Sequence, residues 1–290
     1  MHIVLTIRQI RSAVAAQRKR GKRIGLVPTM GALHQGHMSL IRLAKRKSDF
    51  VVVSIFLNPA QFGPKEDLSK YPRDLKGDTA KCRRAGADLV FAPSVSGIYP
   101  QGFCTNVTVE GLTEGLCAAS RPGHFRGVAT VVCKLFNMVQ PDVAVFGQKD
   151  AQQAAVIKRM VSDLNLPVEI VVAPIVRERD GLAMSSRNAY LTPAERAQAP
   201  ALRHALQLAK RLVKKGRRSA EAIKREMAKM LDIEAPLGVV EYVEIVDNEN
   251  LKPVRRIDGK ALVALAVKFP SARLIDNTVL QRLMPVPTWA

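Results

Sequence analysis

Largely apolar runs alternate with amphipathic segments through the first 176 residues of the chain. The runs cover residues 24–27, 50–57, 88–92, 142–146 and 168–176. Such runs are typical of strands buried on both faces of a parallel sheet. Between them, apolar residues recur at helical spacing, as at Leu40, Ile41 and Ala44. The alternation predicts an α/β fold, a Rossmann-like doubly wound parallel sheet of five or six strands.

Helix and strand signals complete this first part of the chain. Residues 7–23 predict an amphipathic helix that Thr6 caps, with Ile10, Val14 and Ala15 on its inner face. Residues 130–138 and 151–164 predict two further helices. The long connection 95–127 contains a predicted strand at residues 105–110 and a basic loop at residues 121–127.

The pattern changes near residue 177, where we place a domain boundary. Thr192, Pro193 and Glu195 form a capping box that predicts a helix to about residue 215, and Ser219 begins another to about residue 231. Residues 239–246, 260–268 and 272–277 predict a small antiparallel sheet. We therefore expect a nucleotide-binding domain over residues 1–177 and a smaller, lid-like α+β domain over 178–290, with a loose tail at 285–290.

The amino-acid composition limits the kinds of ligand and the cellular compartment that we expect for this chain. The chain has 45 Lys and Arg against 25 Asp and Glu, a formal charge of +20, which favours anionic ligands. The basic residues are spread out and aromatic residues are few, so we expect no specific nucleic-acid site. No apolar stretch approaches the roughly 20 residues of a membrane span. The four cysteines form no Cys-x-x-Cys pair, which favours a reducing, cytoplasmic compartment.

The turn after the first predicted strand carries candidate chemistry. His34 and His37 stand at the expected start of a helix, and Gly31 and Gly36 allow a ligand to approach the backbone. The N–H groups and the dipole of a helix N-terminus bind anions such as phosphate, to which the imidazoles add donors. Taken alone, such a histidine pair is more often structural. A zinc site fits poorly because no nearby acid or cysteine completes it.

Other loops follow strands and should lie at the same edge of the sheet. Asn58 and Gln61 follow one strand, and Lys149 lies in the Gly-bearing turn 147–150 after another. The turn lacks the Walker pattern. Farther along, Ser185, Ser186 and Arg187 can hydrogen-bond a polyphosphate.

The two signatures at residues 34–37 and 184–187 resemble those of the nucleotidylyltransferase superfamily. The match extends over nearly the whole chain to the pantothenate synthetase (pantoate–β-alanine ligase) family. It is carried by residues 28–37, 53–62, 71–73, 121–125, 146–150, 152–153 and 180–188.

The resemblance implies a two-step ligation. Pantoate carboxylate attacks the α-phosphorus of MgATP to give pantoyl adenylate and pyrophosphate, and the amine of β-alanine then expels AMP. Such chemistry needs cations and N–H donors rather than a protein nucleophile. The family also implies a cytoplasmic homodimer.

Site residues are carried over from the resemblance position by position. The implied catalytic residues are His34, His37, Lys149, Ser185 and Arg187, with His37 as proton donor. The resemblance implies that Gln61 and Gln153 bind pantoate and that Gln61 also binds β-alanine. It implies Asn58 and Arg121 as further candidates for substrate binding, and Asp150 as a residue that helps to place Mg²⁺. The implied ATP site comprises Met30, Gly31, Ala32, Leu33, His34, Gln35, Gly36, His37, Gly147, Gln148, Lys149, Asp150, Val176, Met184, Ser185, Ser186 and Arg187.

Two departures and two alternatives qualify this interpretation. Gln148 stands where the family usually has Glu, and Ala60 where it usually has Met, and we expect activity to be retained.

The alternatives are a superfamily enzyme with another acceptor and a nucleic-acid-binding protein suggested by the charge. Gln61 and Gln153, and the lack of a large anticodon-type domain, argue against the first. The spread of the charge argues against the second.

Overall fold

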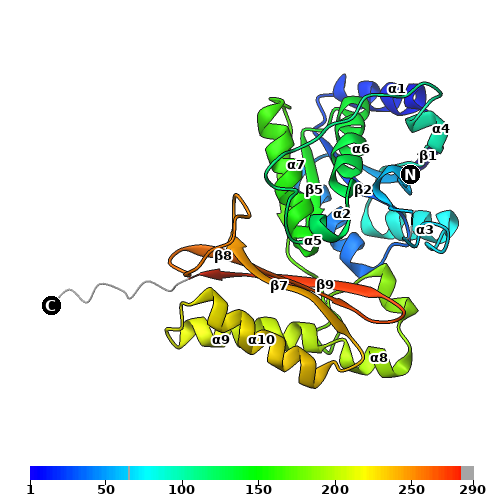
Figure 1. Ribbon diagram of the computed structural model, residues 1–290. Coiled ribbons are helices and arrows are strands. Elements are labelled where there is room, and N and C mark those ends of the chain that lie inside the picture. The colour runs from blue at the N-terminus through cyan, green and yellow to red at the C-terminus, as the bar shows by residue number, and fades with distance from the viewer. Residues whose placement is uncertain (65, 282–290) are drawn as a thin grey trace. The chain divides into compact units, whose positions relative to one another are not determined.

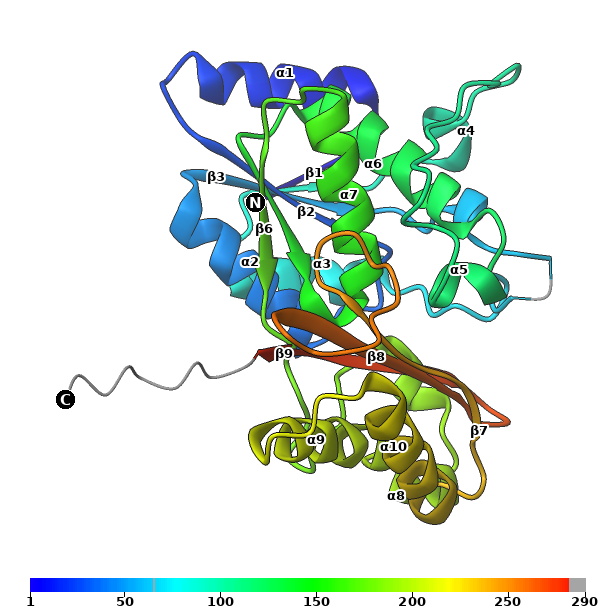
Figure 2. The ribbon, with the colours of Figure 1, turned by 60° about the vertical axis from the view of Figure 1, so that its left-hand side comes forward.

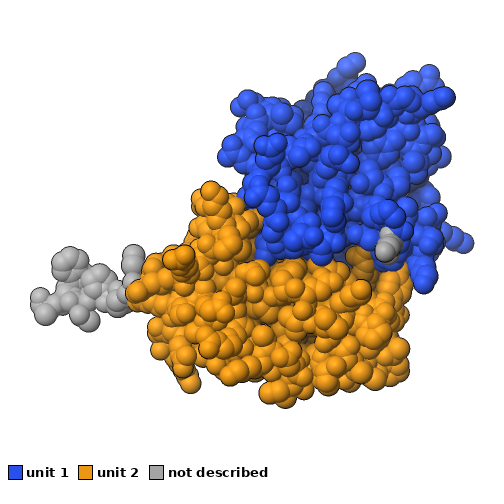
Figure 3. All heavy atoms as spheres, in the orientation of Figure 1, with its two compact units in different colours: residues 1–176 blue, residues 177–290 orange. Residues whose placement is uncertain are grey.

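The computed structural model describes residues 1–64 and 66–281. The chain divides into two compact units, Met1–Val176 and Arg177–Ala290, which Figure 1 labels by element and Figure 3 colours separately. The predicted loose tail at 285–290 lies outside the described residues.

The first unit is built on a six-stranded sheet in the order β1-β4-β3-β2-β5-β6, in which every neighbouring pair is parallel. The predicted α/β class is therefore confirmed. The central strands are almost entirely buried because helices cover both faces. The strands are β1 (His2–Val4), β2 (Ile24–Thr29), β3 (Phe50–Ile55), β4 (Leu89–Phe91), β5 (Val143–Gly147) and β6 (Glu169–Ala173).

Helices of the first unit form two layers (Figure 2). On one side α2 packs against α3 and against β2, β3 and β5, while α1, α6 and α7 pack on one another on the other side. These helices are α1 (Ile7–Arg18), α2 (Gln35–Lys47), α3 (Leu75–Ala85), α6 (His124–Val139) and α7 (Ala151–Asp163). Shorter turns are η1 (Pro59–Gln61), α4 (Val95–Ile98), α5 (Cys117–Ser120) and η2 (Gln148–Asp150).

The order of the strands creates a switch point between β2 and β5. The chain leaves β2 through α2 toward β3 on one side, and β5 pairs with β2 on the other. In open α/β sheets, ligands bind beyond the carboxyl ends of the strands at this point. The turns after β2 and β5 carry the histidines and Lys149, so the topology brings the two predicted anion-binding segments to one edge.

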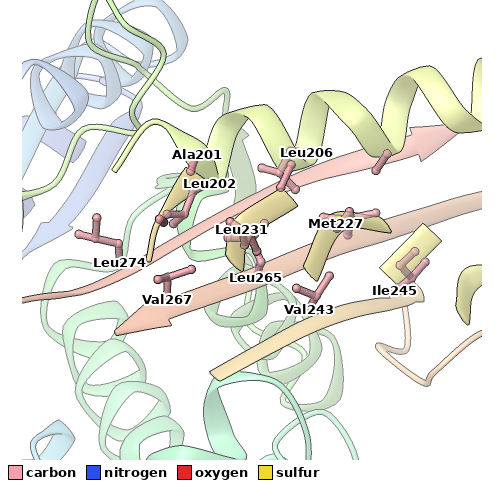
Figure 4. Close-up of a cluster of buried hydrophobic side chains, with 14 of the residues drawn as sticks. Ala201, Leu202, Leu206, Met227, Leu231, Val243, Ile245, Leu265, Val267 and Leu274 are labelled. Atoms are coloured by element: carbon pink, nitrogen blue, oxygen red, sulfur yellow. The ribbon is translucent and has the colours of Figure 1, made fainter. Parts of the chain in front are cut away.

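The second unit is an antiparallel sheet of β7 (Val239–Asp247), β8 (Lys260–Lys268) and β9 (Arg273–Gln281). The helices α9 (Ala201–Lys214) and α10 (Ala220–Glu234) pack on one face. Leu206 and Met227 from the helices meet Val243 and Leu265 from the strands in a buried core (Figure 4). A helical turn η3 (Ser186–Tyr190) and the short helix α8 (Pro193–Gln198) precede this core.

Several local predictions were wrong, each for a physical reason. The predicted helix from Thr192 is two helices, because Pro200 has no N–H to continue the first and instead begins α9. Residues 105–110 form no strand; the Val107 N–H donates to Thr130 Oγ1 of α6 instead of to a neighbouring strand. Helix α6 begins at His124, inside the predicted loop, and Ala15 is exposed. The strand β1 was not predicted because it has only three residues.

Candidate active site

The histidine turn, residues 30–37, joins β2 to α2. His34 is the N-cap of α2, and its Nδ1 accepts a hydrogen bond from the Gly36 N–H at 3.1 Å. His37 Nδ1 accepts from the His34 N–H at 3.3 Å. The two rings lie with their centroids 4.2 Å apart. Histidines therefore perform the capping that Ser or Thr and Glu perform in an ordinary capping box.

This capping determines the tautomers of both imidazoles. A neutral ring nitrogen that accepts a hydrogen bond carries no hydrogen, so each Nε2 carries one. Burial is the main cause that lowers the pKa of His37 to about 3, and the neighbouring His34, Lys149 and Lys81 lower it further. At neutral pH His37 thus presents an uncharged Nε2–H donor at a helix N-terminus, where an anion is favoured.

A buried carboxylate holds the backbone before the histidines. Asp78 of α3 accepts the N–H groups of Ala32 and Leu33, both at 2.8 Å. The Thr29 hydroxyl, at the end of β2, donates to the Ser54 carbonyl at 2.8 Å and accepts from Gly31 N–H at 3.3 Å. The turn is therefore held from both neighbouring elements.

Gln61 lies beside this turn, as expected from the loop that follows β3. Its Nε2 is 2.8 Å from Met30 Sδ, and its Oε1 accepts from Asn58 Nδ2 at 3.2 Å. Asn58, only 1% exposed, also donates to the Gly127 carbonyl at 3.1 Å and accepts from the Tyr99 hydroxyl at 2.7 Å. These protein partners engage the Asn58 amide, which orients Gln61.

Gly127 allows α6 to approach this loop. A Cβ at Gly127 would lie 2.2 Å from the Ala60 carbonyl oxygen, so no larger residue fits without a shift of the backbone. The backbone of Ala60 makes this contact, whereas the residue itself is exposed. The departure of Ala60 from the family pattern therefore falls where the helix and loop meet.

Arg121 is part of a polar cluster behind Gln61. Its guanidinium binds Glu66 through Nε at 2.8 Å and through Nη2 at 2.5 Å. Its Nη1 is 3.1 Å from His124 Nε2, and His124 Nδ1 is 2.8 Å from the Gln61 carbonyl. Burial, followed by the charge of Arg121, lowers the pKa of His124 to about 4. The neutral ring therefore donates from Nδ1 to Gln61 and accepts from Arg121.

The second predicted phosphate-binding turn follows β5. Gly147 ends that strand, residues 148–150 form η2, and α7 begins at Ala151 with Gln153 in its first turn. Lys149 acts electrostatically on His37, and Asp150 acts on His124. The turn thus lies within electrostatic reach of the histidines and of the Gln61 cluster. Val176 follows β6 at the carboxyl edge of the same sheet.

The serine–arginine loop, residues 184–187, belongs to the second unit. Ser185 caps η3 by accepting the Arg187 N–H at 3.3 Å. Asn188 Nδ2 donates to Glu178 Oε1 at 2.7 Å, and Arg196 binds Glu178 at 2.6 Å and Asp180 at 2.5 Å. Glu178 and Asp180, which precede the loop, are thus joined to α8, and Asn188, which follows it, is joined to Glu178.

An ion pair attaches the start of the same segment to β9. Arg177 donates to Asp276 Oδ2 at 2.6 Å and to Oδ1 at 2.9 Å, and also to the Gly181 carbonyl at 2.9 Å. Asp276 is only 2% exposed. The bidentate geometry orients the segment as well as neutralising the buried carboxylate.

Sequence reasoning missed Asp78, Tyr99, His124 and Gln152. Gln152, next to Gln153, holds the loop before Arg121: it accepts the Cys117 N–H at 3.0 Å and donates to the carbonyls of Leu112 and Gly115, both at 2.9 Å. A signal existed for Asp78, which shares the apolar helix face of Cys82 and Ala85. An acid on such a face indicates a buried charge that needs partners. His124 and Gln152 lie in the segments 121–125 and 152–153 that carry the family resemblance, which was a signal for both. We find no comparable signal for Tyr99.

Among residues 1–64 and 66–281, no group of three or more His, Cys, Asp or Glu side chains is arranged to hold a metal ion. No helix in that part of the chain is long and apolar enough to cross a membrane.

Known proteins match the chain over nearly its whole length. The family model described as Pantoate-beta-alanine ligase matches residues 2–279. The pantothenate synthetase of Moorella thermoacetica is 57% identical over 282 residues, covering 97% of this chain and 99% of that protein. The crystal structure of pantothenate synthetase from Thermus thermophilus superposes with a TM-score of 0.91 at 47% identity, covering 96% of this chain and 99% of that one.

A third match carries ligands. The crystal structure of pantoate-beta-alanine ligase from Francisella tularensis, complexed with beta-gamma ATP and beta-alanine, has a TM-score of 0.79 and 33% identity, covering 96% of this chain and 97% of that one.

Proposed function

The chain belongs to the pantoate–β-alanine ligase family and condenses pantoate with β-alanine in an ATP-dependent, AMP-forming reaction, and we propose that the histidine turn and the Lys149 turn carry its adenylation step. One observation carries the residue assignment. The capped histidines present two Nε2–H donors at the start of α2, on the sheet edge that Lys149 shares.

In the first step, an oxygen of the pantoate carboxylate attacks the α-phosphorus of ATP. The new O–P bond forms as the bond to pyrophosphate breaks, and negative charge develops on the phosphoryl oxygens. We assign His34 and His37 to these oxygens as hydrogen-bond donors and Lys149 as the cation that brings two anionic substrates together. His37 is neutral in the free protein, so it donates a hydrogen bond there. Bound polyphosphate would favour its protonation and its role as proton donor.

Pantoate is assigned to Gln61 and Gln153. The Gln61 carboxamide lies against Met30 of the histidine turn and is held by Asn58. In the second step the amine of β-alanine, placed by Gln61, attacks the acyl carbon, the C–N bond forms and AMP leaves. Asn58 and Arg121 are engaged by Tyr99 and Glu66, which supports a role for both in holding the Gln61 loop.

We assign the remaining ATP contacts residue by residue from the family resemblance. In the first unit they comprise residues 30–37, Gly147, Gln148, Asp150 and Val176. In the second they comprise the serine–arginine loop, with Ser185 and Arg187 hydrogen-bonding the departing pyrophosphate. This assignment of the loop is supported by the ion pairs that hold the residues before it, Arg177 with Asp276 of β9 and Glu178 with Arg196 of α8.

We also propose Mg²⁺, a homodimer and a cytoplasmic location. The donor set fits a magnesium ion that takes most of its ligands from phosphate and water, with Asp150 as the protein carboxylate, because Mg²⁺ bound to nucleotides commonly uses only one or two carboxylates. When bound, the ion neutralises charge on the phosphates. The family resemblance supports the dimer and the location.

The test is exchange of labelled pyrophosphate into ATP, with and without pantoate and with no β-alanine. Exchange that depends on pantoate would establish reversible adenylation by this chain. Exchange with another carboxylic acid, and none with pantoate, would retain the ATP site and overturn the substrate assignment.

A further inference from the structure

Asp78 is a buried acid that the steps above do not use. It lies on α3 with 1% of its surface exposed, on the helix face that packs toward α2. A carboxylate taken out of water needs strong partners. Lys81, one helical turn later, places its Nζ 3.5 Å from Asp78 Oδ1.

The two oxygens of Asp78 are directed at one short stretch of backbone. Oδ2 accepts the Ala32 N–H and Oδ1 accepts the Leu33 N–H, both at 2.8 Å. Hydrogen bonds to an ionised acceptor are about twice as strong as neutral ones. The carboxylate therefore fixes the orientation of two successive peptide groups.

That stretch has a backbone conformation that needs support. Gly31 has φ of 90° and Ala32 has φ of 51°, both in the left-handed region. Glycine adopts this region readily, whereas an alanine there is unfavourable. A Cβ on Gly31 would lie 3.1 Å from Asp78 Oδ2, so the carboxylate also packs closely on the turn.

The same turn leads directly into the catalytic histidines. Leu33, whose N–H Asp78 binds, immediately precedes His34, the N-cap of α2. Lys81 is also one of the cations that lower the pKa of His37. The Asp78–Lys81 pair therefore lies beside both imidazoles, and the direction in which the chain leaves β2 decides where their Nε2–H groups point.

We propose that Asp78 is a positioning residue for adenylation, which holds the left-handed turn at Gly31 and Ala32 so that His34 and His37 face the reacting phosphate. The assignment rests on the function proposed above for the two histidines. In this role Asp78 acts through the backbone N–H groups of Ala32 and Leu33.

The test compares Asp78→Asn with Asp88→Asn in the full-length protein by pantoate-dependent pyrophosphate exchange. Asp88 is a matched control: it also accepts a backbone N–H, that of Val51 at 2.8 Å, and pairs with Lys45 at 2.9 Å, but at the amino end of β3. Misplacement by about 1 Å can reduce a rate about 10²-fold. We expect a loss of this order in kcat for Asp78→Asn, a much smaller change in the KM of pantoate, and a near wild-type rate for Asp88→Asn.

Two further variants keep the test decisive. If Asp78→Asn does not fold, Asp78→Glu retains the charge and moves the carboxylate outward, and it should also lose rate while its circular dichroism stays native. Ala32→Gly in the Asp78→Asn background should recover part of the rate, since glycine adopts the left-handed conformation unaided.

Contrary results are equally specific. A wild-type rate in a folded Asp78 variant, an equal loss in the Asp88 control, or no recovery with Ala32→Gly would overturn the positioning role. Wild-type protein without pantoate-dependent exchange would instead refute the proposed function, so the two failures are distinguishable.

Discussion

The histidine turn and the serine–arginine loop are held by different forces. In the histidine turn, neutral imidazoles cap a helix that begins where a central strand ends, and the Asp78 carboxylate binds the backbone before them. The serine–arginine loop is framed by arginine–carboxylate pairs to α8 and β9. The first arrangement follows mainly from the sheet edge, with one added carboxylate, whereas the second depends on arginine–carboxylate pairs, of which Arg177–Asp276 spans 99 residues. Charge-neutralising changes should therefore affect the two regions differently.

The largest expected effect is on the stability of the second unit. Asp276→Asn leaves the guanidinium of Arg177, whose side chain is 17% exposed, without its buried counter-charge. Breaking such a pair costs about 3–5 kcal/mol of unfolding free energy. Urea unfolding measures it. Asp258→Asn is the control, because Asp258 is 59% exposed and its pairs with Arg218 and Arg256 should contribute no more than about 1 kcal/mol. Equal losses would show that burial of Asp276 is unimportant.

Removal of a donor from the first region should affect the rate far more than the stability, although His37→Ala also removes a hydrogen bond that caps α2. His37→Ala and Lys149→Ala should each lower kcat about 10²–10³-fold, as loss of one donor to a developing oxyanion does. Circular dichroism should stay native. His204→Ala is the control, since His204 pairs with Glu234 on the surface of the second unit. Near-normal rates in both variants would remove these residues from the chemistry.

A smaller effect on ATP binding is expected from the partly exposed ion pairs beside the serine–arginine loop. Arg196→Met removes the pairs with Glu178 and Asp180, which are 29% and 37% exposed. Such pairs contribute about 0.2–1 kcal/mol each. We expect the KM for ATP to rise a few-fold with little change in kcat, and part of its salt dependence to disappear. Arg159→Met, which removes an exposed pair on α7, should leave the KM unchanged; an equal rise there would argue against a specific frame.

A further effect concerns acid. His37 and His124 have pKa values of about 3 and 4 in the folded protein, below the ordinary 6.5. Between those values and pH 6.5 the unfolded chain therefore binds more protons than the folded protein. The free energy of unfolding that the two neutral histidines contribute is complete above pH 6.5 and decreases as the pH falls toward their folded pKa values. Asp180 differs, because its hydrogen bond to Arg196 lowers a pKa that is already acidic. Its contribution persists until the pH falls below about 3.8.

Hydrogen–deuterium exchange, corrected for intrinsic rates, can separate these regions. Between pH 6.5 and 5, the amides of α2 and α6 should lose protection before those of α8. His124→Asn keeps a donor in the position of Nδ1 but does not titrate, so it should reduce the loss in α6. Simultaneous loss in all three helices would contradict the comparison.

Local physics explains what could be predicted from the sequence. Strands buried in a parallel sheet need largely apolar sequences, so the apolar runs predicted the parallel sheet and the alternation of its strands with helices. Thr6, Thr192 and Ser219 are caps whose side chains bond within three residues, and each prediction of a helix start from them is confirmed. The histidine turn was equally local, since a strand, a glycine and a helix start adjoin in sequence.

Contacts between distant residues were decided only by the tertiary structure. Nothing near Ala32 indicates that Asp78, 46 residues away, binds its N–H, nor does Arg177 reveal its partner 99 residues later at Asp276. Residues 105–110 alternate like a strand, yet they form none, and the Val107 N–H donates to Thr130 Oγ1 instead. Sequence patterns record which surfaces prefer burial and which backbone groups can be satisfied nearby. The partner of a buried charge or an extended segment depends on which elements the folded chain brings beside it.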